Sequence, residues 1–333
     1  MRYVVIGAGA IGCVVSARLT MAGEDVTLLA RGAAYQRIRQ DGVELNSRSA
    51  TDRVPVRAVD ELSGDGASDD AAVLLCVKSQ DTNGALRQVV SAGTRNARIV
   101  CFQNGVENER RALRQFADVY GVDTICASTL VAPGVVRTYH EPKLGMFDIG
   151  RYPSGADECT EEISAALRRS AFISHATVDI MRWKYRKLLR NLYNAVTAVC
   201  GDDAMKGPLP ELVRTEGEAC FGAAGIAFAS KAEDDARRDG VVDLTPTSVL
   251  PRHNSTWQSL ERQASIETDY LNGEIVMLGR LHGVPTPYNC ALQAMAAEMS
   301  RLRMQPGAYS VADVMGEAAR SGQLPVHSDR GAS

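Results

Sequence analysis

A chain of 333 residues is longer than one hydrophobic core usually supports, so its length predicts two domains. A formal net charge of -3 provides no basic surface for nucleic acid or an acidic membrane, and no apolar run is long enough to span a bilayer. The eight cysteines are scattered without a CxxC pair or a Cys/His cluster, which argues against disulfides and structural zinc. We therefore expect a cytoplasmic protein with no signal peptide and no metal site.

The first segment combines a strand, a glycine motif and a helix. Strand formers from Tyr3 to Ile6 lead directly into Gly7-x-Gly9-x-x-Gly12, and apolar residues at helical spacing follow. In such a motif the first glycine permits a tight turn, the second lets the backbone approach a pyrophosphate, and the third lets helix and strand pack closely. The phosphates would bind the free N–H groups at the helix N-terminus. This order predicts a dinucleotide site, with a glycine-rich turn that binds nothing as the alternative. Its residues are Gly7, Ala8, Gly9, Ala10, Ile11 and Gly12.

The second predicted strand, Asp25 to Ala30, ends at Arg31. An NAD site usually has an acidic residue at this place to accept from the ribose 2′-OH. Arg31 offers instead a fixed cation with a planar fork of donors, which suits a 2′-phosphate. Arg37 and Arg39 lie close enough in sequence to assist. A solvated loop arginine is the alternative, and we predict NADPH rather than NADH as the cofactor.

Strand-like and helix-like segments alternate up to about residue 176 and predict a Rossmann-type, doubly wound sheet in a domain spanning 1–178. The segment rich in Gly and Asp over 63–70 is expected to be a loop. Continuous apolar runs over 72–77 and 97–102 are typical of buried parallel strands. The remaining expected elements are strands over 124–131, 135–139 and 144–149, a helix over 158–170 and a short strand over 171–175.

From residue 179 the pattern is almost entirely helical, which predicts an all-helical C-terminal domain over 179–310. The expected helices cover 179–200, 209–237, 254–281 and 288–304. Residues 311–333 are polar and small, so we expect a partly disordered tail whose last ten residues are disordered. The predicted fold class is thus α/β, a Rossmann-type sheet followed by a helical domain.

A polar stripe marks the first helix of this second domain. At about 100° per residue, Asn191 lies roughly 40° from Lys187 and Asn194 roughly 20° from it on the other side. Asparagine prefers helix caps, so two of them inside one helix need an explanation. A solvated face is one explanation. The other is a face that binds a carbonyl substrate and supplies a proton.

Taken in order, the motifs of this chain resemble those of the ketopantoate reductase (2-dehydropantoate 2-reductase) family over residues 1 to 300. Each motif by itself is weak evidence for the family, but the whole set in this order is specific for it. They are Gly7-x-Gly9-x-x-Gly12, Leu28-Leu-Ala-Arg-Gly32, Val77-Lys-Ser-Gln80, Gln103-Asn-Gly-Val-Glu107, Lys187-Leu-Leu-Arg-Asn191, Ser255, Glu267-Thr-Asp-Tyr-Leu-Asn-Gly273 and His282-Gly-Val-Pro285.

The resemblance implies an NADPH-dependent reductase of pantothenate biosynthesis that converts 2-dehydropantoate to pantoate. It implies Lys187 as the general acid, with Glu267 near the lysine and the cofactor. It also implies Asn191 as a substrate ligand and Ser255 at the substrate carboxylate.

On the cofactor side, the resemblance places Asn104 where nicotinamide and substrate meet, and Lys78 near the cofactor. Arg31 matches the arginine that the family uses for the 2′-phosphate, which agrees with the reading of the second strand. The implied partner is a small carbonyl substrate, and a homodimer is left open.

The substrate side departs from the family pattern. Ala195 stands where family members typically carry a second asparagine, and Asn194 is the candidate replacement. Trp257 and Ser259 also differ from the family's Ser-Met-Leu-Gln-Asp stretch. These changes keep two alternatives open: a reductase of another ketone or an imine, and a non-catalytic NADPH sensor. Lys184, on the same helix face, is the alternative general acid.

Overall fold

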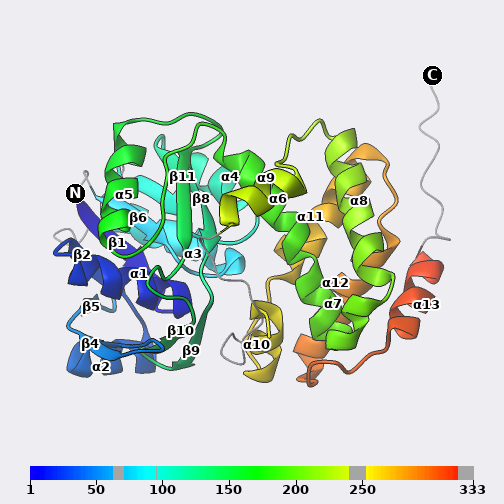
Figure 1. Ribbon diagram of the computed structural model, residues 1–333, viewed down its shortest axis with the longest axis horizontal. Coiled ribbons are helices and arrows are strands. Elements are labelled where there is room, and N and C mark those ends of the chain that lie inside the picture. The colour runs from blue at the N-terminus through cyan, green and yellow to red at the C-terminus, as the bar shows by residue number, and fades with distance from the viewer. Residues whose placement is uncertain (63–70, 95, 240–252, 322–333) are drawn as a thin grey trace. The chain divides into compact units, whose positions relative to one another are not determined.

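The computed structural model describes residues 1–62, 71–94, 96–239 and 253–321 (Figure 1). The loop expected over 63–70 and the disorder expected for the last ten residues lie outside these ranges. The chain divides into two compact units, Met1–Lys184 with Ala229–Arg252, and Tyr185–Phe228 with His253–Ser333. The expected division between residues 178 and 179 is thus displaced into helix α6 (Ile180–Asn191), and a later segment returns to the first unit.

A seven-stranded sheet, ordered β11-β8-β7-β6-β1-β2-β5, forms the centre of the first unit. All neighbours pair in parallel except β11, which is antiparallel to β8. This confirms the predicted Rossmann-type sheet. The strands are β1 (Arg2–Ile6), β2 (Asp25–Leu29), β5 (Arg57–Val59), β6 (Ala72–Leu75), β7 (Arg98–Cys101), β8 (Val119–Ile125) and β11 (Met146–Arg151).

Helices cover both faces of this sheet (Figure 1). Successive residues of β1 show the two layers, since Val5 belongs to the same buried cluster as Val15 of α1, and Ile6 belongs to the other cluster with Leu86 of α3. A strand buried on both faces needs apolar residues at every position, which explains the continuous apolar runs. The helices that connect or follow the strands of this unit are α1 (Ala10–Met21), α2 (Gly32–Asp41), η1 (Ser79–Asp81), α3 (Thr82–Ser91), α4 (Asn108–Leu113) and α5 (Glu158–Arg169).

A second, four-stranded sheet of order β4-β3-β10-β9 belongs to the same unit. Its strands are β3 (Val43–Asn46), β4 (Thr51–Val54), β9 (Ser128–Ala132) and β10 (Val135–Thr138). Strands β3, β4 and β5 have no counterpart in the sequence prediction, because they are short and carry polar residues. The strand expected over 124–131 falls across the end of β8 and the start of β9. The segment expected as a strand over 171–175 forms only an isolated bridge, at Ile173.

The second unit is helical throughout its described residues, as predicted. Its core includes Val196, Leu209, Leu292 and Val314, all fully buried. No helix among the described residues is long and apolar enough to cross a membrane. The elements are the end of α6, α7 (Tyr193–Cys200), η2 (Asp202–Lys206), α8 (Leu209–Ala223), α10 (Ser255–Glu261), η3 (Thr268–Tyr270), α11 (Asn272–His282), α12 (Pro287–Leu302) and α13 (Val311–Ser321).

Three of the expected long helices are shorter in the structure. The helix expected over 179–200 is interrupted at Leu192, whose carbonyl accepts a hydrogen bond from the Asn272 side chain at 3.4 Å. A side chain that bonds into the helical ladder is a known cause of such an interruption. The helix expected over 254–281 is divided into α10, η3 and α11.

The third, expected over 209–237, ends at Ala223, and a separate helix α9 (Lys231–Arg238) joins the first unit. Ser230 and Glu233 form the capping box that starts α9. Arg237 forms ion pairs with Asp148 and Asp123, two buried carboxylates that face each other across β11 and β8. A buried pair of like charges requires such a cation, and this requirement explains why α9 packs on the sheet.

The C-terminal segment from residue 311, expected to be a tail, begins with helix α13. The Ser310 hydroxyl accepts from the backbone N–H of Asp313 at 3.2 Å, and the Asp313 carboxylate accepts from the Ser310 N–H at 2.8 Å. Val314 and Ala318, four residues apart, are buried in the helical core. This reciprocal cap and the spacing of the two apolar residues are signals that the sequence prediction missed.

The junction of β1 and α1 depends on two glycines. Gly7 has φ +110°, which side chains rarely adopt, and its N–H donates to the Leu29 carbonyl at 3.1 Å. A Cβ atom at position 12 would lie 1.8 Å from the Gly7 carbonyl oxygen. By contrast, a Cβ atom at Gly9 would meet nothing within 4 Å.

We therefore expect Gly12→Ala to lower the free energy of unfolding by about 1–3 kcal/mol, the usual effect of an extra group in a tightly packed site. Gly9→Ala is the matched control and should cost less than about 1 kcal/mol, since it only weakens a helix cap. Urea denaturation of both variants measures the difference. Equal stability of the two variants would contradict the close approach at position 12.

Candidate cofactor and substrate site

Four parallel strands of the first unit bring predicted cofactor residues to one edge of the sheet. Gly7 follows β1, Arg31 comes two residues after β2, Lys78 follows β6 by three residues, and Asn104 follows β7 by three residues. Because these strands run in parallel, their carboxyl ends share one edge. Ligands of doubly wound sheets bind at this edge. These four residues therefore share the sheet edge at which a nucleotide is predicted to bind.

The glycine loop fits the pyrophosphate of a dinucleotide. Gly9 is the N-cap of α1, and no side chain of the described residues caps this helix. The N–H groups of the first turn are therefore available to an anion, and a Cβ atom added at Gly9 would meet nothing within 4 Å. Ala8, Ala10 and Ile11 lie beside it, partly buried against the sheet core.

Two cysteines flank this loop without adding reactivity to it. Burial raises the pKa of the Cys13 thiol to about 12, and it raises the pKa of the Cys76 thiol well above the ordinary value. Both thiols therefore stay protonated at neutral pH. Because the thiolate is the reactive form, thiol chemistry is not expected at this edge.

Arg31 differs from the two arginines that follow it. Its side chain is exposed at the start of α2. Arg37 forms an ion pair with Asp41, and Arg39 lies over the Tyr35 ring, 5.9 Å from its centroid. The two residues expected to assist are thus engaged in interactions within α2.

A buried polar network joins the loops that carry Lys78 and Asn104. The Asn108 side chain donates to the Asn104 carbonyl at 2.9 Å and to the Ser79 hydroxyl at 3.2 Å, and it accepts from the Thr82 hydroxyl at 2.8 Å. Ser79, Thr82 and Asn108 are almost completely buried. None of these three residues was among the predicted site residues, although Ser79 lies within the motif Val77-Lys-Ser-Gln80. The signal that could have identified them is a polar residue at a position that the fold buries, where an apolar residue would be expected.

Lys184, the alternative general acid, is a buried structural residue. It is 3% exposed and forms a 2.7 Å ion pair with Glu109, which is 0% exposed. Its ammonium also donates to the carbonyls of Gln103 at 2.9 Å and Val122 at 3.3 Å. Removing one partner of such a pair typically costs about 3–5 kcal/mol, because an uncompensated charge stays buried. Lys184 therefore holds the first turn of α6 and the loop before Asn104.

On the same helix, Lys187 and Asn191 lie one turn apart in the second unit, both half-buried. The Asn191 side-chain nitrogen is buried and has no hydrogen-bond partner in the described part of the chain. A buried amide left unpaired costs free energy unless a ligand or water satisfies it. The Asn191 amide nitrogen is therefore available to a ligand or a water molecule.

The other predicted substrate residues lie on separate elements of the second unit. Asn194 is half-buried in α7, Ser255 is the exposed first residue of α10, and Glu267 is half-buried directly before η3. Ala195 is 1% exposed within the helical core. Leu192, between α6 and α7, keeps helical backbone angles (φ -59°, ψ -32°), so the polar stripe of Lys187, Asn191 and Asn194 stays a prediction.

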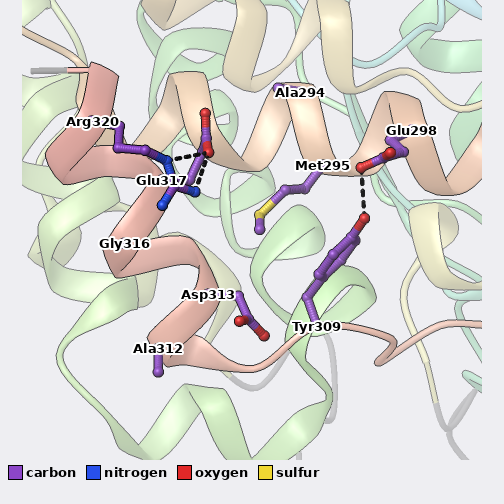
Figure 2. A pocket seen from close by; sticks show the side chains of 9 residues that line it. All are labelled: Ala294, Met295, Glu298, Tyr309, Ala312, Asp313, Gly316, Glu317 and Arg320. Carbon is purple, nitrogen blue, oxygen red and sulfur yellow. Dashed lines mark hydrogen bonds and ion pairs between the residues drawn. The ribbon is translucent and has the colours of Figure 1, made fainter.

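A surface pocket of about 660 Å³ lies between α12 and α13 but contains none of the predicted site residues (Figure 2). Its carboxylates already have partners. Glu298 accepts from the Tyr309 hydroxyl at 2.6 Å, and Glu317 pairs with Arg320 at 2.6 Å (Figure 2). We therefore place the candidate site elsewhere. Within the described ranges, no group of three or more His, Cys, Asp or Glu residues could hold a metal ion.

Comparison with known proteins agrees with the sequence motifs. The chain is 27% identical over 299 residues to the 2-dehydropantoate 2-reductase of Pyrococcus horikoshii, covering 89% of this chain and 96% of the relative. Its fold is similar to that of a PanE/ApbA family ketopantoate reductase from Ralstonia eutropha JMP134, with a TM-score of 0.76, 28% identity, and 91% and 99% of the two chains covered. The ternary structure of D-mandelate dehydrogenase with NADH and anilino(oxo)acetate shares the fold, with a TM-score of 0.78, 21% identity, and 91% and 99% coverage.

Two family models match most of the chain. The model described as ketopantoate reductase PanE/ApbA matches residues 3–154, and the model of the family's C-terminal part matches residues 179–300. The chain therefore belongs to the ketopantoate reductase PanE/ApbA family.

Proposed function

We propose that this protein is an NADPH-dependent reductase of a 2-oxo acid, with 2-dehydropantoate as the substrate and pantoate as the product. The observation that carries the proposal is the placement of the glycine loop, Arg31 and Asn104 at one edge of the sheet, in a chain of this family. The reaction class is further supported by relatives named 2-dehydropantoate 2-reductase. The free state of all eight cysteines fits the cytoplasm as the place of the reaction.

Residues of the first unit would hold the cofactor. The N–H groups at the start of α1 would bind the pyrophosphate, and the Arg31 guanidinium would bind the 2′-phosphate. Lys78 and Asn104 would contact the cofactor at the ends of β6 and β7. When bound, the nicotinamide supplies the hydride that reduces the carbonyl carbon.

Residues of the second unit would complete the reaction at the carbonyl oxygen. As negative charge grows on this oxygen, the Lys187 ammonium would stabilise it and donate the proton. Glu267 would favour the charged form of the lysine, since an opposite charge raises the pKa of an amine. Asn191, with its unpaired amide nitrogen, would bind the substrate, Asn194 would assist it, and Ser255 would donate to the substrate carboxylate.

A second candidate substrate is another 2-oxo compound or an imine, because the substrate side departs from the family pattern. Ala195 is buried in the core and cannot bind substrate there. The Trp257 ring stacks on His253 with centroids 3.9 Å apart, close to Ser255 in the chain. Two aromatic rings beside a carboxylate-binding serine would change the volume and shape available to the substrate.

Steady-state NADPH oxidation with a panel of 2-oxo acids, ketones and imines tests the function. We expect 2-dehydropantoate to be reduced with the highest kcat/KM. If another 2-oxo compound or an imine is preferred by more than about tenfold, a difference of roughly 1.4 kcal/mol, the named substrate is wrong and the reaction class stands. Binding of NADPH without turnover of any compound would identify a sensor instead.

We expect Arg31→Ala to weaken NADPH binding by about 1.5–3 kcal/mol, the contribution of a hydrogen bond to a charged group. NADH binding should hardly change, because NADH lacks the 2′-phosphate. Titration of both cofactors measures the effect, with Arg39→Ala as the matched control on the same helix. Equal losses for NADPH and NADH would reject the assignment of Arg31.

We expect Lys187→Ala to lower kcat by about 10²–10⁴-fold, as for a positioned general acid, while NADPH still binds. Lys206→Ala is the control, since its side chain is 82% exposed in the same unit. The panel assay with the best substrate measures both variants. A kcat within a few-fold of the wild type for Lys187→Ala would assign the proton donor to another residue.

A further inference from the structure

We propose that Asn254 is a positioning residue. It connects the start of α10, where Ser255 lies, to α7 and thereby sets the affinity for the substrate carboxylate. The inference rests on the proposed function, in which Ser255 binds that carboxylate. It concerns a residue outside the sequence motifs. All contacts that carry it lie within the second unit.

One half of the Asn254 side chain starts helix α10. Its oxygen accepts hydrogen bonds from the backbone N–H groups of Thr256 and Trp257, both at 3.1 Å. These bonds satisfy two donors of the first turn, as expected of an N-cap asparagine. They fix the backbone on both sides of Ser255.

The other half of the side chain reaches α7. Its nitrogen donates to the Asn194 carbonyl at 3.4 Å and to the Thr197 hydroxyl. An asparagine amide has two N–H donors and a carbonyl oxygen with two lone pairs, and here all four are used. Aspartate could form the cap but offers no donor for the Asn194 carbonyl. The position thus requires both properties of asparagine.

Further contacts support the frame around Ser255 while its side chain stays accessible. The Ser259 hydroxyl donates to the Ser255 carbonyl at 2.7 Å, and the Gln258 side chain donates to the His253 carbonyl at 2.8 Å. Ser255 itself is exposed. A rigid backbone with an accessible hydroxyl is the arrangement that precise binding of a carboxylate requires. Asn254 connects this frame to α7, which also carries Asn194.

The variant Asn254→Asp separates the two roles, because it keeps the cap and removes the donors. Its carboxylate can still accept from the Thr197 hydroxyl, so the double variant Asn254→Asp/Thr197→Val removes every side-chain hydrogen bond between Asn254 and α7. We expect the double variant to raise KM for the 2-oxo acid by about five- to tenfold, the effect of losing about one hydrogen bond. Each single variant should show a smaller increase.

The controls distinguish positioning from loss of structure. The KM for NADPH should stay near the wild-type value and kcat within about threefold of it. Because the N-cap is kept, the loss of stability should not exceed the roughly 0.5–1.5 kcal/mol expected for each hydrogen bond removed. An unchanged KM for the 2-oxo acid in the double variant would overturn the inference, as would equal losses in kcat and in NADPH affinity. A wild-type protein that reduces no 2-oxo acid would overturn the proposed function, and the inference would fall with it.

Discussion

The absence of a side chain at position 12 is the constraint on which the candidate cofactor site depends. Any other residue would place a Cβ atom 1.8 Å from the Gly7 carbonyl oxygen, so α1 could not pack at its present distance from β1. This packing brings the uncapped N-terminus of α1 to the edge where β2, β6 and β7 also end. The position of the first-turn N–H groups of α1 thus depends on one steric condition, while the parallel pairing of the strands brings the residues that follow them to the same edge.

Burial gives two lysines of one helix different properties. Lys184 is enclosed, and its charge is balanced by Glu109 at 2.7 Å and by two backbone carbonyls. Lys187, almost one turn later, is half-buried. A fully buried and paired ammonium cannot approach a substrate, whereas a half-buried one can do so at low desolvation cost. The helical pattern alone treats the two positions as nearly equivalent.

Buried polar networks hold the functional segments in both units. In the first unit, Asn108 connects the loops of Lys78 and Asn104. In the second unit, Asn272 donates to the Leu192 carbonyl at 3.4 Å and to Asn289 at 2.9 Å, and Asn289 donates to Glu216 at 2.7 Å. Burial raises the pKa of Glu216, and hydrogen bonds from Tyr288 and Asn289 counteract that shift. Such buried networks favour one arrangement of the backbone.

Local patterns were sufficient to predict the Rossmann-type sheet and the helical second half, and they marked the glycine motif and Arg31 as candidate cofactor residues. These features depend on periodicity, on glycine and on charge at a strand end, all of which are written along the chain. The tertiary structure alone decided the interruption of the helix at Leu192, the return of α9 to the first unit, the burial of Lys184 and the hydrogen bonds of Asn254 to α7. Each of these depends on partners distant in sequence, such as Asn272 for Leu192 and Asp148 for Arg237. Only folding brings such partners within the few ångströms over which hydrogen bonds and buried ion pairs act.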